Sequence, residues 1–459
     1  MRLSPLYLLC ALALTGCVNL APDYQQPAAP VAEQWPAYAS NGQQSADIAW
    51  QSLFVDARLR DTVALALANN RDLRVAALNV EYQRAQYRIQ RAELFPAVSA
   101  SADGSRQRSV SSSSSGVSSQ YSVGLGVSSY ELDLFGRLGN LKDAALEDYL
   151  ALEQTRRSTQ LSLVAEVATA WMTLAADQQL LALANDTYAS QQKTYALVQQ
   201  SHALGGDSGL SLAQARSTVE SARADAASYA SQVEQDRNAL ELLVGQRLED
   251  RLLPDTSKLD TAVLVGVPAG LPSSLLQRRP DVLAAEHTLK AANADIGAAR
   301  AAFFPSVTLT ATGGSASGEL SGLFKGGSKA WSFAPSINLP IFNAGSNRAS
   351  LDAAKVTREI EVATYEKTLQ TAFSEVADAL SVRAHISERL DAQRNLTEAT
   401  DKAFELSSTL YKQGSESFLE VLDAQRSLYS AQQSLISLEL AEQVNRVTLY
   451  KTLGGGWEG

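Results

Sequence analysis

The sequence predicts an α+β membrane protein whose protomer is a tandem duplication. The chain matches itself at a constant offset of about 209 residues, which indicates two copies of one structural unit. Each copy contains stretches in which apolar and small polar residues alternate, as in β-strands with one apolar face. Each copy also contains very long helical patterns. Strands and helices therefore occur in both halves, and the alternation is of the kind that places a sheet in a membrane.

The composition excludes several classes of protein. The 459 residues include 39 Lys and Arg against 49 Asp and Glu, a net charge of −10, which argues against binding to nucleic acid. No run of about 18 apolar residues is present, so a helical membrane protein is excluded. Because the chain has only three scattered His and two Cys, both near the N-terminus, neither a metal cluster nor a disulfide framework is expected.

The N-terminus has the layout of a secretory signal. A short basic start precedes an apolar run over 3–14, which is too short for a permanent membrane helix. The following Leu14-Thr15-Gly16-Cys17 resembles a bacterial lipobox. We therefore expect residues 1–16 to be a signal peptide and Cys17 to carry N-palmitoyl and S-diacylglycerol groups. Val18, where an inner-membrane lipoprotein usually has Asp, favours the outer membrane; the alternative is an ordinary signal with a coincidental Cys.

The internal match sets the domain boundaries. The first copy covers residues 56–245 and the second 268–455, joined by a linker over 246–267 and followed by a short tail over 456–459. Residues 17–55 contain several Pro among Ala and Gln, and we interpret them as a lipid-anchored extended strap. The residues that coincide between the copies include Asp72, Arg91, Phe95 and Pro96 with Asp281, Arg300, Phe304 and Pro305.

Each copy is predicted to begin with a helix and a β-hairpin. The helices cover 58–93 and 273–302, and each stops at a Phe-Pro pair because the residue before proline leaves the helical region. Two alternating stretches of about 10 to 13 residues follow in each copy, and they predict hairpins over 96–134 and 305–341. The Ser- and Gly-rich segments between the strands are expected to be exposed loops, over 111–119 and 313–327.

Two long helical patterns complete each copy. Their ranges are 138–202 and 208–245 in the first copy and 347–412 and 417–453 in the second. Helices of this length persist by packing side by side. A coiled-coil seam with 3-then-4 spacing is predicted at Leu161, Val164, Ala168, Trp171 and Ala175.

Alternation alone leaves two interpretations of the hairpins. A soluble hairpin would bury its apolar face on a core. A membrane strand instead needs about 9 to 11 residues with one apolar face, and the alternating stretches meet this condition. Four strands cannot close a barrel and an open edge is not stable in lipid, so the chain must then oligomerise. Three copies give twelve strands, an even number in the range of outer-membrane barrels.

Specific motifs occur along the chain beyond these patterns. They are Asn69-Asn70-Arg71-Asp72-Leu73, Tyr130-Glu131-Leu132-Asp133-Leu134-Phe135-Gly136-Arg137, Arg278-Arg279-Pro280-Asp281, Ile296-Gly297-Ala298-Ala299-Arg300 and Tyr450-Lys451-Thr452-Leu453-Gly454-Gly455-Gly456-Trp457. With them the sequence resembles the lipidated outer-membrane factors of tripartite multidrug efflux pumps, the TolC-like channels that serve resistance-nodulation-division transporters. The resemblance covers nearly the whole mature chain.

The resemblance implies an architecture, partners and an activity. It implies a homotrimer with a 12-stranded outer-membrane β-barrel continued by a 12-helix periplasmic α-barrel, in the outer membrane of a Gram-negative bacterium. It also implies a periplasmic adaptor (membrane fusion protein) and an inner-membrane resistance-nodulation-division transporter as partners. The implied activity is that of a passive gated conduit for drugs or other small toxic compounds. No Gly-x-Ser-x-Gly or phosphate-loop motif is present, so we expect neither an enzyme nor a cofactor.

Two alternative functions stay open. An outer-membrane channel for type I protein secretion shares the fold, although lipidation and the Gly-Gly-Gly-Trp ending favour the drug-pump branch. A lipid-anchored periplasmic coiled-coil scaffold or adhesin belongs to a different class and would conduct no ions. For a channel, the net charge of −10 favours a mild preference for cations.

The turns between the long helices are the candidate docking sites. The glycines of these turns permit a tight reversal of the chain. The resemblance implies that the tips contact the adaptor, through Gly205 and Gly206 in the first copy and Gly414 and Ser415 in the second.

The candidate gate lies just after the second turn. Leu419, Asp423 and Arg426 fall at i, i+4 and i+7 on one helix face, and the resemblance implies a periplasmic gate at these residues. Three Asp423 side chains in a trimer would repel one another, and Arg426 can pair with Asp423 at i+3. The aligned residues of the first copy are Ala213 and Arg216, so the acidic ring would come from the second copy only. The alternative is that Asp423 only favours the first turns of its helix through the helix dipole.

Overall fold

The computed structural model describes residues 18–32, 35, 49–111, 114–255 and 273–455. The predicted lipidation site at Cys17 and most of the predicted linker lie outside these residues. The chain divides into two compact units. Unit 1 comprises 1–28, 78–154 and 283–367, and unit 2 comprises 29–77, 155–282 and 368–459, so each unit draws on both copies of the duplication.

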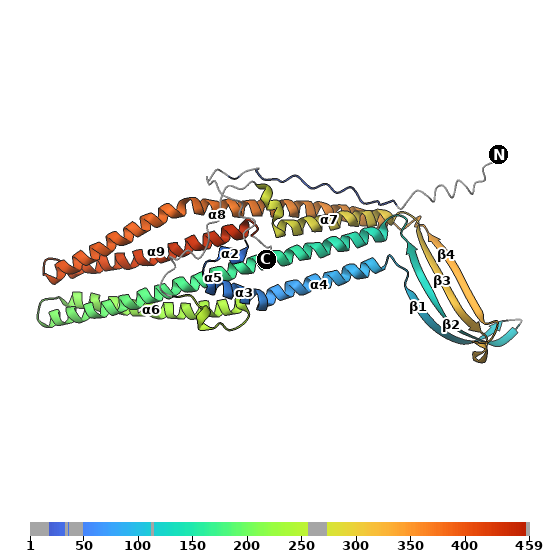
Figure 1. Ribbon diagram of the computed structural model, residues 1–459, viewed down its shortest axis with the longest axis horizontal. Coiled ribbons are helices and arrows are strands. Elements are labelled where there is room, and N and C mark those ends of the chain that lie inside the picture. The colour runs from blue at the N-terminus through green and yellow to red at the C-terminus, as the bar shows by residue number, and fades with distance from the viewer. Residues whose placement is uncertain (1–17, 33–34, 36–48, 112–113, 256–272, 456–459) are drawn as a thin grey trace. The chain divides into compact units, whose positions relative to one another are not determined.

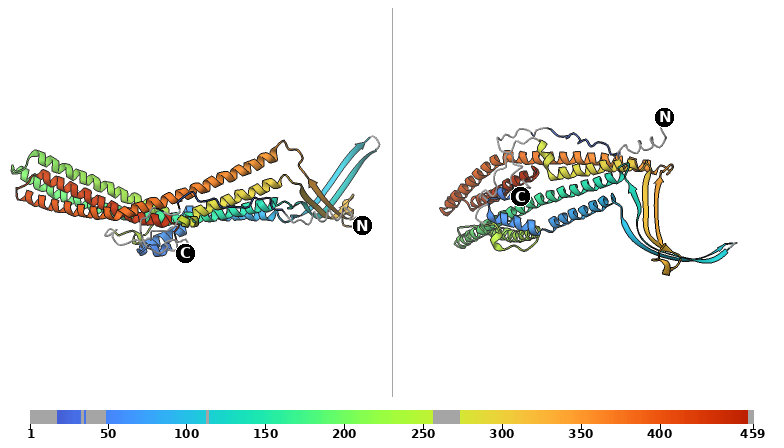
Figure 2. Two further views of the ribbon diagram at one scale, coloured as in Figure 1. Left: turned by 90° about the horizontal axis from the view of Figure 1, so that it is seen from above. Right: turned by 45° about the vertical axis from the view of Figure 1, so that its right-hand side comes forward.

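A four-stranded antiparallel sheet lies in unit 1 (Figure 1). Its strands are β1 (Val98–Ser111), β2 (Ser114–Leu132), β3 (Ser306–Ser317) and β4 (Lys329–Asn338). They pair in the order β1-β2-β3-β4, so the second strand of the first hairpin joins the first strand of the second hairpin. The sheet curves along the strands (Figure 2). Strands β1 and β4 form its two edges.

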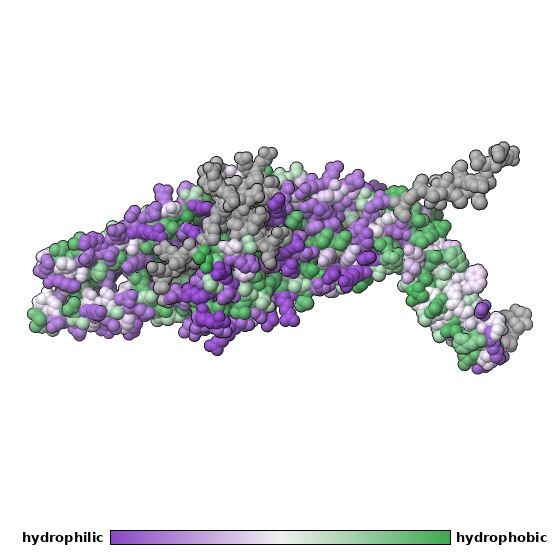
Figure 3. All heavy atoms as spheres, in the orientation of Figure 1, coloured by the Kyte–Doolittle hydropathy of each residue, from purple (hydrophilic) through white to green (hydrophobic). Residues whose placement is uncertain are grey.

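The register of the sheet gathers the alternating apolar residues on one face. Val98 pairs with Val127, Val127 with Ala311, and Ala311 with Phe333. A bulge between Val127 and Tyr130, with Ser129 at φ 55°, shifts the phase of β2. Because of that shift Tyr130 pairs with Leu309, which keeps the apolar face continuous. Figure 3 shows hydrophobic residues along the strands.

The strands of the first hairpin are longer than the alternation predicts. β1 has 14 residues and β2 has 19, whereas β3 and β4 have 12 and 10. The predicted loop over 111–119 is wrong, since pairing continues to Ser111 and Ser114. Backbone hydrogen bonds between strands do not depend on the side chain. A run of Ser can therefore extend strand pairing without the apolar alternation that predicts a strand.

The helices of the first copy are α2 (Trp50–Leu53), α3 (Ala57–Asn69), α4 (Arg71–Ala92), α5 (Arg137–Ala203) and α6 (Gly209–Val244). Those of the second copy are α7 (Pro280–Ala301), α8 (Ser346–Lys412) and α9 (Phe418–Thr452). Short 3₁₀ turns cover Asp250–Leu252, Ser273–Arg278 and Leu320–Gly322. α5 and α8 have 67 residues each. In both Figures 1 and 2, α6 runs beside α5 and α9 beside α8.

The first helix of each copy is shorter than predicted. Asn70 has an extended backbone, with ψ 134°, and separates α3 from α4. Its side chain accepts a hydrogen bond from the amide of Leu73 at 2.8 Å, as an N-cap does, and donates to the carbonyl of Leu243 at 2.8 Å. In the second copy the residues before Pro280 form a 3₁₀ turn, and α7 begins at this proline because its missing N–H is unpaired at that position anyway.

The burial of the predicted seam on α5 is confirmed. Its five residues are all buried, with exposed fractions between 0% and 9%: Leu161, Val164, Ala168, Trp171 and Ala175. The indole N–H of Trp171 also donates to the carbonyl of Leu252 at 3.0 Å. No described helix is long and apolar enough to cross a membrane.

The part of the predicted strap in unit 1 lies against α7. Arg300 donates to the carbonyl of Leu20 at 2.9 Å, and Asn293 donates to the carbonyl of Pro22 at 2.7 Å. The amide of Val18 donates to the carbonyl of Leu134 at 3.3 Å. The strap is therefore fixed through its backbone, and its first described residue lies just beyond the end of β2.

Candidate functional site: the helix tips and the exposed face of α9

The two tips share one backbone design. Gly205 and Gly414 adopt left-handed conformations, with φ 88° and 74°. The amide of the next residue, Gly206 or Ser415, donates back five residues to the carbonyl of Ser201 or Leu410, at 2.9 and 3.0 Å. With a second bond from each left-handed glycine to the carbonyl three residues back, this is the Schellman arrangement that ends helices. The four residues predicted at the tips therefore form two matched turns.

A serine begins the next helix at each tip. The Ser208 side chain accepts from the amide of Ser211 at 3.1 Å, and that of Ser417 accepts from the amide of Glu420 at 3.4 Å. Such caps satisfy one of the free N–H groups in the first turn. Five residues separate the two helices at each tip, and Leu204 in the first tip is 82% exposed.

A hydrogen bond joins the two tips. The hydroxyl of Tyr411 on α8 donates to Oδ2 of Asp207, in the first tip, at 2.9 Å. Burial and this carboxylate raise the pKa of Tyr411 to about 12, so the hydroxyl keeps its proton at neutral pH. The backbone carbonyl of Asp207 is also 2.8 Å from Nδ1 of His202. Asp207 therefore connects the end of α5 to the end of α8.

A small apolar cluster supports this connection. Its buried members are Val198, Ala215, Phe418 and Leu422, which come from α5, α6 and α9. The rings of Tyr411 and Phe418 lie 5.5 Å apart. The first turn of α9 is therefore packed on both copies of the duplication.

The predicted gate residues lie on the exposed face of α9. Leu419 is 49% exposed, and Asp423 and Arg426 are also exposed. The opposite face of the same turns is buried, through Phe418, Val421, Leu422, Gln425 and Leu428. The three predicted residues thus share a face that is exposed in the described part of the chain. In the aligned turn of α6, Ala213 and Arg216 are exposed as well.

The pairing of Asp423 with Arg426 is absent from the described part of the chain, where neither side chain makes a hydrogen bond or an ion pair. Arg426 instead lines a polar cavity of about 150 Å³ between α5, α6 and α9. This cavity has room for water, since a water molecule takes about 30 Å³ of liquid volume. The Arg426 side chain is therefore available for another partner.

Sequence reasoning missed the polar interior of this cavity. The buried Thr218 hydroxyl donates to Oε1 of Gln191 at 2.9 Å. Gln425 is only 6% exposed, and its Oε1 has no hydrogen-bond partner within the described residues. The duplication aligns Gln425 with Ala215, which is an apolar core residue. That mismatch was the available signal that α9 has a polar group in its buried face.

The described residues offer no arrangement for metal chemistry, since no group of three or more His, Cys, Asp or Glu among them could hold a metal ion. The site consists instead of two turns, one hydrogen bond between them and an exposed acidic residue. These features can position helix ends and present charge.

Comparison with known proteins identifies the family of this protein. Residues 62–246 and 271–455 each match the family described as outer membrane efflux protein. The chain therefore belongs to the outer membrane efflux protein family, and the resemblance seen in its motifs is confirmed.

Individual relatives are similar over nearly their whole lengths. The probable efflux pump outer membrane protein TtgC of Pseudomonas putida is 53% identical, over 97% of this chain and 94% of that protein. A membrane protein from Pseudomonas aeruginosa has a solved structure with a TM-score of 0.90 at 44% identity, covering 96% of this chain and 98% of that one. The open state of the Neisseria gonorrhoeae MtrE outer membrane channel gives 0.87 at 42% identity, with 96% and 98% covered. The chain is thus an outer-membrane efflux protein with the fold of these channels.

Proposed function

We propose that the protein is the outer-membrane channel of a tripartite efflux pump, a passive gated conduit that exports drugs or other small toxic compounds. The observation that carries the proposal is the sheet of unit 1, which has a continuous apolar face and two strands with unpaired edges, β1 and β4. Unpaired strand edges are not stable in lipid, so β4 of one protomer must pair with β1 of the next protomer. The relatives are named as efflux pump proteins, which supports the direction of transport.

A homotrimer closes this sheet. Three protomers with four strands each give a 12-stranded barrel. Their long helices α5, α6, α8 and α9 together give a 12-helix periplasmic barrel. α5 and α8, at 67 residues, are long enough to extend roughly 100 Å from the membrane, at about 1.5 Å per residue. A periplasmic adaptor and an inner-membrane resistance-nodulation-division transporter are the proposed partners, which is supported by the relatives named as efflux pump outer membrane proteins.

We assign closure of the channel and docking of the adaptor to the tips of the long helices. Leu419, Asp423 and Arg426 on the exposed face of α9 would line the narrow end of the helical barrel. Gly205, Gly206, Gly414 and Ser415 are exposed and form rigid turns that an adaptor can contact. The geometry of α9 supports the assignment of the gate. The same turns that bury Phe418 leave the gate residues free to face another protomer.

Cys17 is the proposed lipid anchor. It immediately precedes Val18, whose amide is bonded to Leu134 close to the end of β2. Acyl chains on Cys17 would thus start near the membrane end of the barrel. The proposed location is the outer membrane of a Gram-negative bacterium, with the helices in the periplasm, and the names of the relatives support it. Growth with labelled palmitate tests the anchor, since a Cys17→Ser variant that still takes up label would contradict it.

The decisive experiment combines mass and conductance of the purified protein. We expect a trimer mass and stepwise ion conductance in planar bilayers. A monomer without conductance would favour the lipid-anchored scaffold instead. Deletion of the gene distinguishes an efflux channel from a type I secretion channel. Increased drug susceptibility supports efflux. Loss of a secreted protein with unchanged drug susceptibility supports type I secretion.

A further inference from the structure

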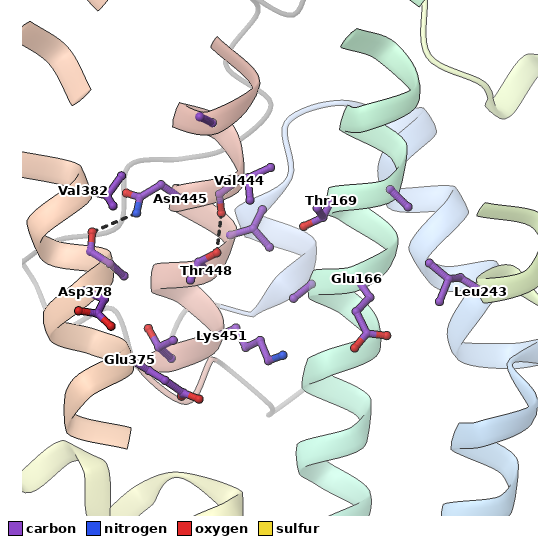
Figure 4. A pocket seen from close by; sticks show the side chains of 16 residues that line it. Glu166, Thr169, Leu243, Glu375, Asp378, Val382, Val444, Asn445, Thr448 and Lys451 are labelled. Carbon is purple, nitrogen blue, oxygen red and sulfur yellow. Dashed lines mark hydrogen bonds between the residues drawn. The ribbon is translucent and has the colours of Figure 1, made fainter. Parts of the chain in front are cut away.

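A pocket in unit 2 has the size and lining of a small-molecule site. It has a volume of about 840 Å³ and is lined by α5, α6, α8 and α9 (Figure 4). Ligand sites in proteins commonly span about 300 to 1,000 Å³ and combine apolar walls with a few polar groups. Half of the residues that line it are aliphatic, including Leu243, Val382 and Val444. The walls therefore suit the apolar body of a drug-sized molecule.

The charges around the pocket are mainly negative. Glu166 on α5, Glu375 and Asp378 on α8, and Lys451 on α9 line it. Figure 4 shows Glu166 and Asp378 on opposite sides of the α9 segment that carries Lys451. Glu375 accepts a hydrogen bond from Arg279 at 2.8 Å, and Arg279 also pairs with Asp281, so this one cation offsets only part of the charge of Glu375. The exposed Glu166 and Asp378 then outnumber the single ammonium of Lys451.

We propose that this pocket binds a hydrophobic organic cation. The aliphatic walls would take the apolar body, and Glu166 or Asp378 would face the positive charge. An anion would be repelled by the carboxylates.

The binding itself requires only this pocket. That the bound cation is cargo in transit rests on the proposed function. The carboxylates are exposed, so ionic strength should weaken binding, because salt screens charges beyond about 8 Å at 0.15 M. A weak, salt-sensitive site suits a molecule that must also leave.

Titration of the purified full-length chain with ethidium, followed by fluorescence polarisation, tests the proposal. We expect saturable binding of one ethidium per chain, displaced by tetraphenylphosphonium. Asp378→Asn and Glu166→Gln should each weaken binding by about three- to fivefold, the scale of one exposed ion pair. Lys451→Met should strengthen it by a similar factor, because it removes the one repelling charge. Asp391→Asn is the matched control, an exposed carboxylate on α8 that does not line the pocket.

Three results would overturn the proposal. The first is absence of saturable binding to a trimer that conducts, which would mean that a neighbouring copy covers the pocket. The second is wild-type affinity in both carboxylate variants, and the third is weaker binding in Lys451→Met. The proposed channel is tested separately, because loss of conductance with intact, charge-dependent ethidium binding contradicts the channel and leaves the site in place.

Discussion

The hydroxyl of Tyr411 lies 2.9 Å from Oδ2 of Asp207, and this hydrogen bond is the side-chain link between the turn of the first copy and the helix that leads into the turn of the second. The two residues are 204 positions apart in the sequence. A constriction built at the helix tips depends on how the two turns of each protomer are held. We therefore expect this bond to favour the closed arrangement.

Tyr411→Phe should increase conductance. The change keeps the ring on Phe418 and removes only the hydroxyl, at a cost of about 1 kcal/mol for the lost hydrogen bond. Single-channel recording measures the effect. The control is a double-mutant cycle with Asp207→Ala: if the bond acts as described, the double variant conducts like either single variant, and additive increases would contradict it.

The same bond predicts a pH response. The pKa of Tyr411 is raised to about 12 in the fold, so the protonated hydroxyl is the form that the folded tips favour. The contribution of the bond is complete below the ordinary tyrosine pKa near 10 and is lost as pH rises through about 12. Conductance of the wild type should therefore rise between about pH 10 and 12, and an equal rise in Tyr411→Phe would assign it to other groups.

Asp423→Ala should raise single-channel conductance and reduce cation preference. In the proposed trimer, three Asp423 carboxylates would form a ring that narrows the pore and attracts cations, and the aligned turn of the first copy has Ala213 instead. Reversal potentials in a salt gradient measure the preference. Glu398→Gln serves as the control, because it removes an exposed carboxylate from α8 well before the tip. Unchanged conductance in the Asp423 variant would exclude this residue from the gate.

The ends of the long helices could be predicted to within about two residues, because Gly and Ser signal them locally. Gly205 and Gly414 end helices in left-handed conformations, and Ser208 and Ser417 begin the next ones. Asn70 was available as a similar signal, since it precedes an acidic residue in the first turn, but the continuous Ala- and Leu-rich pattern on both sides concealed it.

Contacts between distant residues could not be predicted in the same way. The duplication aligns equivalent positions of the two copies, yet Asp207 and Tyr411 are not equivalent and meet only because the copies pack together. The unpartnered Oε1 of Gln425 likewise depends on which neighbours α5 and α6 supply. Sequence periodicity identifies the buried face of a helix and leaves its partners undetermined.

Gly414→Ala should destabilise the second tip by about 1 kcal/mol, because φ 74° places Cβ close to the neighbouring carbonyl oxygen. Apart from the glycine and its two chain neighbours, no heavy atom lies within 4 Å of the added Cβ, so the cost comes from the local backbone alone. Thermal unfolding measured by circular dichroism is the readout. Gly209→Ala is the control in the first turn of α6, where φ is not positive and space is open, and it should be neutral or stabilising. Equal destabilisation by both changes would contradict the left-handed turn.

Arg279→Met should lower stability by about 3 kcal/mol. Arg279 is 8% exposed and donates to Asp281, to Glu375 and to the carbonyl of Thr452, at 2.7 to 3.0 Å. Removing the guanidinium takes a donor from the buried carbonyl of Thr452 and the counter-charge from Glu375 and Asp281, although Asp281 still accepts from the amide of Val282. Chemical denaturation measures the free energy of unfolding of Arg279→Met and of the control Arg278→Met, which changes the exposed residue that precedes Arg279. Equal effects of the two changes would show that the buried network contributes nothing.

Gly314→Ala should prevent correct pairing of β2 with β3, which is the junction between the two hairpins. A Cβ on Gly314 would overlap the carbonyl oxygen of Val123, and Gly314 pairs with Gly124, whose own Cβ would lie 2.9 Å from the carbonyl oxygen of Gly313. The backbones can therefore approach only without side chains at this crossing. Gly313→Ala, one residue away, meets nothing within 4 Å and should be tolerated. Outer-membrane barrels resist denaturation by detergent until heated, so gel mobility with and without boiling reports assembly. We expect the heat-modifiable band to persist in Gly313→Ala and to be lost in Gly314→Ala, and its survival in both would mean that this junction adjusts to a side chain.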